Sequence, residues 1–402
     1  MWHGGKYIDI FAGCGGLSLG LCNAGFNGVF AIEKNKDAFS TFKYNLITNK
    51  SHFEWPKWLT ISEHDINDVM KTAKDELVKL QGTVDLVAGG PPCQGFSMAG
   101  KRKADDQRNQ LVKSYVKFIR IIQPNAIVFE NVHGFTVNFK EDKRKGKKYA
   151  NYVINALKRM GYKTAYQIVD MSDFGIPQSR KRFILVAFKE HDPKKFFEVL
   201  YERREGFFTQ KGITQKNTAK DAIGDLEKAH GCVDSPDTKH FKAGIYGPIS
   251  SNYQRLLRDN RLLANCAIDS HRFVNHTSDI VKLHNDLLQN APRAKRITPS
   301  DGVVDGLKRR GVTVLAENKL VPTITSIPDE LVHYKEPRIL TVREHARIQS
   351  FPDWFCFKGK YTSGGKMRKK EVPRYTQVGN AVPPLFAEQV GLALKEVMKD
   401  GE

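Results

Sequence analysis

Strand-like and helix-like segments alternate along the first 190 residues, and this alternation restricts the fold more than any other feature. Runs with the character of strands lie at residues 6–11, 28–33, 61–66, 84–90 and 125–132. Such alternation is typical of a doubly wound sheet with mostly parallel strands. The run at 84–90 is apolar enough to be buried on both faces, as parallel strands are. We therefore predict an α/β fold with a doubly wound, mostly parallel Rossmann-like sheet.

The pattern changes after residue 162. Residues 164–189 form two extended segments around the turn Gly175–Ile176–Pro177, which predicts a hairpin. From about 191 to 322 the alternation is lost, and we interpret this stretch as a second, smaller domain of mixed structure. A helix signal returns where Glu344 follows Thr341 by three residues, the spacing of a capping box. The chain ends in an amphipathic helix.

Charge and composition point to the kind of partner. The chain carries 64 basic and 44 acidic residues, a formal net charge of +20. Solubility needs much less charge, so a polyanionic partner such as nucleic acid is the better explanation. No apolar run approaches the roughly 20 residues that cross a bilayer, and the N-terminus lacks a secretory layout. The six cysteines include no CxxC pair, so we expect free thiols, no metal site and a soluble intracellular protein.

Glycines and acidic residues at successive strand ends predict a cofactor site. The turn Gly13-x-Gly15-Gly16 lies between a strand and a helix, where backbone amides approach a ligand. Its spacing differs from the G-x-G-x-x-G of dinucleotide-binding folds. Glu33 ends the second strand, where a carboxylate can accept from two ribose hydroxyls, and Asp65 could receive an adenine amino group. The series favours a cofactor that contains adenosine.

A cysteine follows two prolines in the segment GGPPCQGFS, directly after the strand at 84–90. A packed structural thiol is the default interpretation for a lone cysteine. The prolines stiffen the approach to Cys93, and small and polar residues after it permit a mobile loop. Glu130 ends the next strand and is a candidate acid beside a nucleophilic cysteine. Arg180 and Arg182 are two apart in an extended segment and are expected to point the same way, as two forks suited to a carboxylate or phosphate.

Six segments in this order resemble the motifs of the DNA (cytosine-5)-methyltransferase family. They are DIFAGCGG, GGPPCQGFS, ENV, QSRKR, RILTVREHARIQSFPDWF and QVGNAVPP. The resemblance implies an S-adenosylmethionine-dependent methyltransferase sheet built from 1–190 and 370–402, with the last helix packing back onto it. It also implies a target-recognition domain and hinge at 191–369. Nothing resembles the added domains of large eukaryotic relatives, so we expect a bacterial or phage modification enzyme acting in the cytoplasm.

The resemblance also implies cofactor contacts by motif position. S-adenosylmethionine, which leaves as S-adenosylhomocysteine, is expected to lie along the strand ends, with the far C-terminus completing its pocket. The expected contacts are Phe11, Gly13, Gly15, Gly16, Leu17, Glu33, Asp65, Ile66, Gly90, Pro92, Leu111, Asn380, Ala381 and Val382. Cys14 in the same turn is interpreted as a small packed residue.

The same resemblance assigns the catalytic roles. Cys93 is the nucleophile that attacks carbon 6 of a cytosine flipped out of double-stranded DNA, which divides one hard step into two easier ones. Glu130 holds ring nitrogen 3 and Asn131 orients its segment, while Arg182, assisted by Arg180, holds the base and its developing charge. Expected DNA contacts are Gln94, Ser97, Lys101, Arg102, Lys103 and Gln178. We expect a monomer that is either part of a restriction–modification system, with a cognate endonuclease encoded nearby, or an orphan modification enzyme.

The sequence features argue against three other functions. A tRNA cytosine-5 methyltransferase shares the motifs and the mechanism, but its hallmark is not recognised in the second domain. A non-catalytic DNA-binding member of the fold would require a damaged motif, whereas Cys93, Glu130 and Arg182 are all present. An NAD-dependent oxidoreductase is disfavoured by the glycine spacing and by the cysteine after two prolines.

Overall fold

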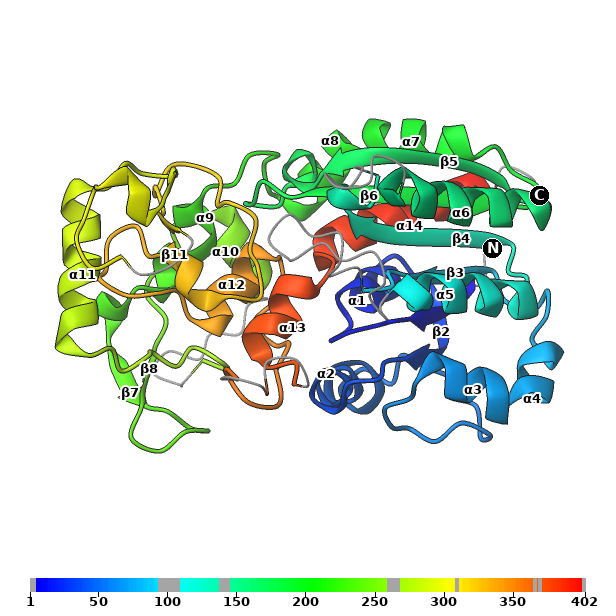
Figure 1. Cartoon of the computed structure of the whole chain (residues 1–402), viewed down its shortest axis with the longest axis horizontal. Helices are drawn as coiled ribbons and strands as arrows, with labels where there is room; N and C mark the ends of the chain where they lie inside the picture. The colour runs from blue at the N-terminus through cyan, green and yellow to red at the C-terminus, as the bar shows by residue number, and fades with distance from the viewer. Residues whose placement is uncertain are drawn as a thin grey trace. The chain divides into compact units, whose positions relative to one another are not determined.

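The computed structural model describes residues 5–92, 109–136, 145–258, 268–307, 311–363, 367 and 371–399. The chain divides into two compact units. Unit 1 comprises Met1–Asp170, Lys181–Arg204 and Phe386–Glu402, and unit 2 comprises Met171–Arg180 and Glu205–Leu385. Figure 1 labels their helices and strands.

Unit 1 is built on a six-stranded sheet with the order β2-β1-β3-β4-β6-β5 (Figure 1). The strands are β1 (Lys6–Ile10), β2 (Asn27–Ile32), β3 (Leu86–Gly89), β4 (Ala126–Val132), β5 (Lys163–Asp170) and β6 (Lys181–Phe188). The pairs β2–β1, β1–β3 and β3–β4 are parallel, whereas β6 runs antiparallel to both β4 and β5. The predicted doubly wound, mostly parallel α/β sheet is confirmed, and so is the hairpin of β5 and β6.

Alternate side chains of β1 enter the two faces of the sheet. Ile8 and Ile10 join a core with α3 (Ile66–Thr72), α4 (Lys74–Lys79), α5 (Asn109–Ile122) and α6 (Lys145–Arg159). On the other face, α1 (Gly16–Asn23) packs closely against α14 (Pro384–Lys399), since a Cβ on Gly20 would lie 2.3 Å from that of Ala387. The last helix thus contributes to the same unit as the first.

The predicted strand at 61–66 is wrong. Residues 61–65 form bends and extended chain, and α3 begins at Ile66. These residues are too polar for a buried strand, and Asp65 instead caps α3 by accepting a hydrogen bond from the Asn67 amide. Between β2 and this segment lie α2 (Lys36–Phe42) and a π-helix, η1 (Lys43–Asn49). The chain in unit 1 then continues after β6 with α7 (Pro193–Glu202).

Unit 2 contains short helices and two small sheets. Its helices include α8 (Arg204–Lys211), which begins in unit 1, α9 (Ala219–Ile223), α10 (Asn252–Arg258), α11 (Ser278–Asn290), α12 (Val342–Ile348) and α13 (Arg374–Asn380). The strands β7 (Cys232–Asp234) and β8 (Lys242–Gly244) form a hairpin. The strands β9 (Arg296–Ile297), β10 (Val312–Val314) and β11 (Leu331–Val332) form a sheet that packs against α11.

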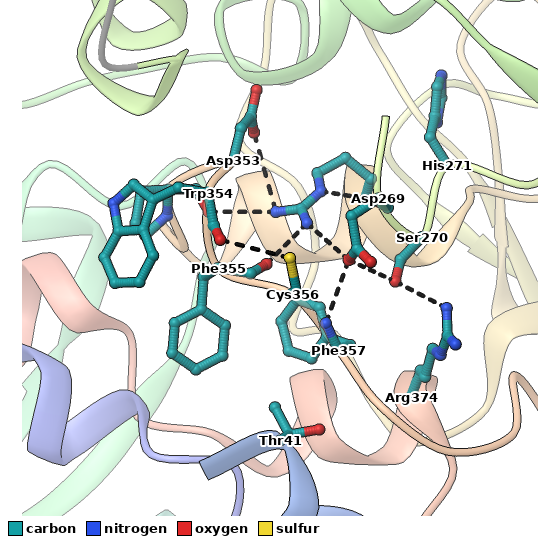
Figure 2. A network of polar contacts seen from close by, with 12 residues as sticks. Thr41, Asp269, Ser270, His271, Asp353, Trp354, Phe355, Cys356, Phe357 and Arg374 are labelled. Atoms are coloured by element: carbon teal, nitrogen blue, oxygen red, sulfur yellow. Dashed lines mark hydrogen bonds and ion pairs between the residues drawn. The ribbon is translucent and has the colours of Figure 1, made fainter. Parts of the chain in front are cut away.

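The helix α12 is buried along its whole length although it carries several charged side chains. Thr341 and Glu344 form the predicted capping box, which confirms the N-cap. Arg347 pairs with Asp353 at 2.6 Å, and Arg343 pairs with Asp269 at 3.0 Å and donates to main-chain carbonyls. Figure 2 shows Asp269 and Asp353 within this network of polar contacts. Because each buried charge has an opposite charge beside it, this helix can form part of a core.

No helix among the described residues is long and apolar enough to cross a membrane.

Candidate active site

The turn after β1 has an unusual backbone. Phe11, Gly13 and Gly15 have φ values of 62°, 58° and 99°. Left-handed φ is costly for a bulky residue such as Phe11, and such strain is concentrated at ligand sites. At Gly15 a Cβ would also lie 2.7 Å from Leu46 Cδ1, so only glycine fits there. The turn leads into α1 at Gly16 without a side-chain cap, which directs the positive end of the helix dipole toward it.

Glu33 follows β2 and connects the turn to the start of α2. Its Oε2 accepts from the Gly13 amide at 2.9 Å, and its Oε1 accepts from the Asn35 amide at 2.7 Å. Burial raises the pKa of Glu33, and the three backbone amides around it oppose that rise. Since each carboxylate oxygen has a second lone pair, Glu33 can still accept from ligand hydroxyls.

Asp65 has two roles within unit 1. It caps α3, and its Oδ2 pairs with Lys34 Nζ at 2.7 Å. Burial tends to raise the pKa of Asp65, but the hydrogen bond from Lys34 and the Asn67 amide lower it overall. Its neighbour Ile66 is in the hydrophobic core. The side chain of Asp65 is only 18% exposed, so a ligand would have to approach it from one side.

The remaining predicted cofactor residues are distributed over both units. Leu17 is buried in α1, and Leu111 is half-buried in α5. Asn380, Ala381 and Val382 lie in unit 2, at the end of α13 and directly after it. Their contact with a cofactor stays a prediction.

Sequence reasoning did not find Asp9, a buried carboxylate in the middle of β1. Asp9 is 1% exposed, and its Oδ2 accepts from Ser18 Oγ at 2.6 Å. Its Oδ1 has no hydrogen-bond partner among the described residues. Burial raises the pKa of Asp9 to about 7, with a smaller contribution from the charge of Glu33. The available signal was an acidic residue inside an otherwise apolar strand.

Asp9 is expected to make the protein less stable as the pH rises from 5 to 8. The folded state holds a proton on Asp9 up to about pH 7, whereas the unfolded chain loses it near pH 4. Folding therefore takes up a proton in this window, and the free energy of unfolding falls as the pH rises. Urea titrations should show that the free energy of unfolding of Asp9→Asn rises relative to that of wild type by on the order of 2 kcal/mol between pH 5 and pH 8. If the free energies of unfolding of the two proteins change in parallel with pH, the raised pKa of Asp9 is contradicted.

No disulfide involves the four described cysteines, Cys14, Cys22, Cys232 and Cys356. Burial raises the pKa of Cys14 to about 12, so this thiol stays protonated. The interpretation of Cys14 as a small packed residue is confirmed.

The end of β3 positions the segment that leads to Cys93. A Cβ on Gly90 would lie 2.7 Å from the carbonyl oxygen of Glu130 and 2.8 Å from its Oε2, so only glycine permits this approach. Asn131 Nδ2 donates to the carbonyl oxygen of Pro91 at 3.2 Å. Asn131 therefore connects β4 to the Gly90–Pro92 segment. Cys93 and the predicted DNA contacts Gln94, Ser97, Lys101, Arg102 and Lys103 lie outside the described residues.

An ion pair joins β4 to β6 beside this segment. Arg182 Nε lies 3.0 Å from Glu130 Oε1, and the two side chains are 12% and 14% exposed. Antiparallel pairing places Val132 opposite Arg182, two residues from Glu130. Burial lowers the pKa of Arg182, and the charge of Glu130 opposes that change. A carboxylate next to Gly90 is thus held in place by one guanidinium.

Two residues of the QSRKR segment have partners within unit 2. Arg180 lies directly before β6 and donates to the carbonyls of Ile324, Gly379 and Ala381. Gln178 is fully buried, donates to Gln349 Oε1 at 2.7 Å and accepts from the Ile324 amide at 2.8 Å. The catalytic role of Arg180 and the contact of Gln178 with substrate stay predictions.

Comparison with known proteins identifies the family. A sequence model of the C-5 cytosine-specific DNA methylases matches residues 5–396. The chain belongs to this family. The resemblance found in the sequence is confirmed by this match, and so is the enzyme class, DNA (cytosine-5)-methyltransferase.

Curated members of the C-5 cytosine-specific DNA methylase family match almost the whole chain. The type II methyltransferase M.XorII of Xanthomonas oryzae is 31% identical over 405 residues, covering 98% of this chain and 85% of that protein. M1.HphI of Haemophilus parahaemolyticus is 31% identical over 396 residues, covering 96% and 86%. A solved structure described as a prophage DNA modification methyltransferase of E. coli has a TM-score of 0.67 at 23% identity, covering 98% and 99%. That likeness supports the fold.

Proposed function

We propose that this enzyme transfers a methyl group from S-adenosylmethionine to carbon 5 of cytosine within a short specific sequence of double-stranded DNA. The proposal includes a restriction–modification role in the cytoplasm, a monomeric enzyme and a cognate restriction endonuclease. The observation that carries it is the Glu130–Arg182 ion pair next to Gly90, at the start of the segment that leads to Cys93. A held carboxylate beside a nucleophile loop is what addition to a cytosine ring requires.

The residues around the β1 turn are suited to an adenosine-containing cofactor. The strained turn, the uncapped start of α1 and the carboxylate of Glu33 provide a cradle for polar groups. A Cβ on Gly13 would have no atom within 4 Å, which leaves open space beside the turn. We propose that Glu33 accepts from the ribose hydroxyls and that Asp65 faces the adenine. S-adenosylmethionine, when bound, supplies an electrophilic methyl group.

The proposed chemistry on the base uses residues of unit 1. The target cytosine leaves the duplex, at a cost of a few kcal/mol in stacking and pairing. The Cys93 thiolate forms a bond to carbon 6, and the electron pair of the carbon 5–carbon 6 double bond shifts through carbon 4 toward ring nitrogen 3. Glu130, in its protonated form, gives its proton to that nitrogen, and Arg182 pairs with the carboxylate that remains. Carbon 5 then takes the methyl group. Removal of the carbon 5 proton by a base restores the double bond as the bond to Cys93 breaks, and the nitrogen returns its proton to Glu130.

Arg180 is proposed as a positioning residue. It donates to two carbonyls in and after α13, those of Gly379 and Ala381, and Gln349 Nε2 donates to the Ala381 carbonyl at 3.2 Å as well. These bonds hold the segment that carries Asn380, Ala381 and Val382. We propose that this segment completes the cofactor pocket and that unit 2 recognises the target sequence.

Bisulfite sequencing of DNA treated with the purified enzyme tests the proposed function. Protected cytosines should all lie in one sequence context, and labelled methyl groups should enter DNA only when S-adenosylmethionine is present. Transfer to tRNA in preference to duplex DNA would contradict the proposal.

Gly90→Ala is expected to lower the rate of methyl transfer about tenfold or more. The added Cβ would push against both the carbonyl and the carboxylate of Glu130, and a displacement of about 1 Å at a catalytic group can cost a hundredfold. The measurement is the single-turnover rate, with circular dichroism to verify folding. Gly206→Ala is the matched control, because a Cβ there meets no atom within 4 Å. Equal effects of the two substitutions would contradict the positioning role of Gly90.

A further inference from the structure

Arg272 in unit 2 packs against two aromatic rings. Its guanidinium carbon lies 4.1 Å from the centre of the Phe241 ring and 3.8 Å from the centre of the Tyr361 ring. Contacts of this kind combine cation–π attraction with stacking of the planar guanidinium. An arginine held in this way loses little further rotamer freedom on binding a ligand. The N–H groups of its guanidinium therefore point in a fixed direction before the ligand binds.

The main chain around Arg272 is also fixed. Arg272 pairs with Ala243 of β8, and the next residue, Phe273, donates its amide to Lys242 at 2.9 Å. The preceding His271 is fully buried, with ring nitrogens bonded to Thr341 Oγ1 at 2.8 Å and to the Leu226 carbonyl at 2.9 Å. The backbone that carries Arg272 is thus part of the rigid interior of unit 2.

The neighbouring buried Arg374 has an acidic partner, whereas Arg272 has none among the described residues. Arg374 pairs with Asp237 at 2.6 Å and donates to Ser270 Oγ at 3.1 Å, and the latter bond belongs to the network in Figure 2. The hydroxyl of Tyr361 bonds to both oxygens of the same Asp237. Asp237 is therefore already engaged on both of its oxygens.

In the part of the chain that the structure describes, the guanidinium of Arg272 forms no hydrogen bond or ion pair, and its Nε is buried without a partner. A buried donor without an acceptor costs about 1–3 kcal/mol. The aromatic contacts offset part of this cost. The side chain remains partly exposed, so its terminal nitrogens can serve an external acceptor.

We propose that Arg272 reads a guanine in the target sequence, donating from its two terminal nitrogens to O6 and N7. This assignment rests on the proposed function, because it requires duplex DNA as the substrate. The paired acceptors on the major-groove edge of guanine match the fork of a guanidinium. A phosphate can be held by any flexible cation, whereas orientation by two rings is useful for a planar edge with fixed acceptors.

The test uses wild type, Arg272→Met, which keeps the stem against the rings, and Arg272→Lys, which keeps the charge. After the target sequence is known, each guanine in it is replaced singly by 7-deazaguanine, which lacks the N7 acceptor. We expect one replacement to lower kcat/KM of wild type about tenfold or more. Both variants should have a kcat/KM about 10–100-fold lower than wild type on the unmodified site. The one replacement that affects wild type should not lower kcat/KM of the variants any further.

Several outcomes would overturn the assignment. The first is that the loss of kcat/KM from the substitution adds to the loss from 7-deazaguanine at every guanine. The second is that the substitution lowers kcat/KM equally on all sequences and reduces the salt dependence of binding, because that result indicates a phosphate contact. Arg296→Met, at a surface arginine paired with Glu330, is the control and should leave the guanine profile unchanged. If Arg272→Met does not fold, a wild-type enzyme that is insensitive to every replacement still refutes the assignment.

The two proposals can fail separately. A wild-type protein that methylates no cytosine contradicts the proposed function. In that case the bound sequence is first selected by affinity from a random pool of duplexes, and the binding of its 7-deazaguanine derivatives, measured by fluorescence anisotropy, tests Arg272 by the same comparison.

Discussion

Cys93→Ser is expected to abolish methyl transfer while leaving the binding of S-adenosylmethionine largely intact. A hydroxyl at this position is far less ionised and less nucleophilic than a thiol, so the bond to carbon 6 does not form. Removing the nucleophile of a covalent mechanism typically costs at least about 10³-fold in rate. The measurements are incorporation of labelled methyl groups into DNA and calorimetric titration of the cofactor.

The covalent adduct between Cys93 and DNA can also be detected directly. On DNA with fluorine at carbon 5 of the target cytosine, no proton is available for removal, so wild type should remain covalently attached to the DNA. Mass spectrometry should find that adduct with wild type and not with Cys93→Ser. Cys232→Ser, at an exposed cysteine of unit 2, is the matched control and should behave as wild type. Methylation by Cys93→Ser at near wild-type rate would refute the covalent mechanism.

Glu130→Gln is expected to lower kcat by about 10²–10⁴-fold, the usual contribution of a positioned acid or base. The amide oxygen of glutamine can still accept from Arg182 Nε, which Glu130 contacts at 3.0 Å, so the fold should be kept. The amide can also donate to ring nitrogen 3, but it cannot supply a proton to it. The loss should therefore fall on kcat, with a much smaller change in KM for DNA.

Arg182→Met provides the complementary measurement on the same ion pair. It leaves the carboxylate of Glu130 buried without its partner, which typically costs about 3–5 kcal/mol. The double variant Glu130→Gln, Arg182→Met should recover part of that stability, because the uncompensated charge is gone. Arg203→Met, which breaks an exposed ion pair with Glu396 in unit 1, is the control and should lower the free energy of unfolding by about 1 kcal/mol or less. A Glu130→Gln enzyme with nearly wild-type kcat would contradict the assigned role of Glu130.

The candidate residues near the strand ends were predictable because of the geometry of parallel sheets. Glu33, Gly90 and Glu130 lie where β2, β3 and β4 end or just beyond, and parallel strands bring such ends to one edge. Their partners were not predictable. Glu33 binds the amides of Gly13 and Asn35, and nothing in the local pattern indicates which donors a carboxylate will meet.

Side-chain partners were also not predictable where they depend on a distant segment. Arg180 lies directly before β6, which begins at Lys181, and it donates to the carbonyls of Ile324, Gly379 and Ala381. Gln178 donates to Gln349, which is 171 residues away in the chain. The two-residue spacing of Arg180 and Arg182 contains no information about these contacts.

The sequence by itself determined the fold class and the family, and it predicted the reacting groups. These predictions rest on periodicity, glycine turns and motif order, which are local features of the sequence and can be recognised without information on distant contacts. The tertiary structure decided which charges are paired and which donors are left unsatisfied. It placed Glu130 against Gly90, buried Asp9 beside Ser18, and packed Arg272 against two aromatic rings with no acidic partner among the described residues. These properties depend on burial and on neighbours far away in the chain, because the charge state and hydrogen bonding of a side chain follow from what surrounds it in space.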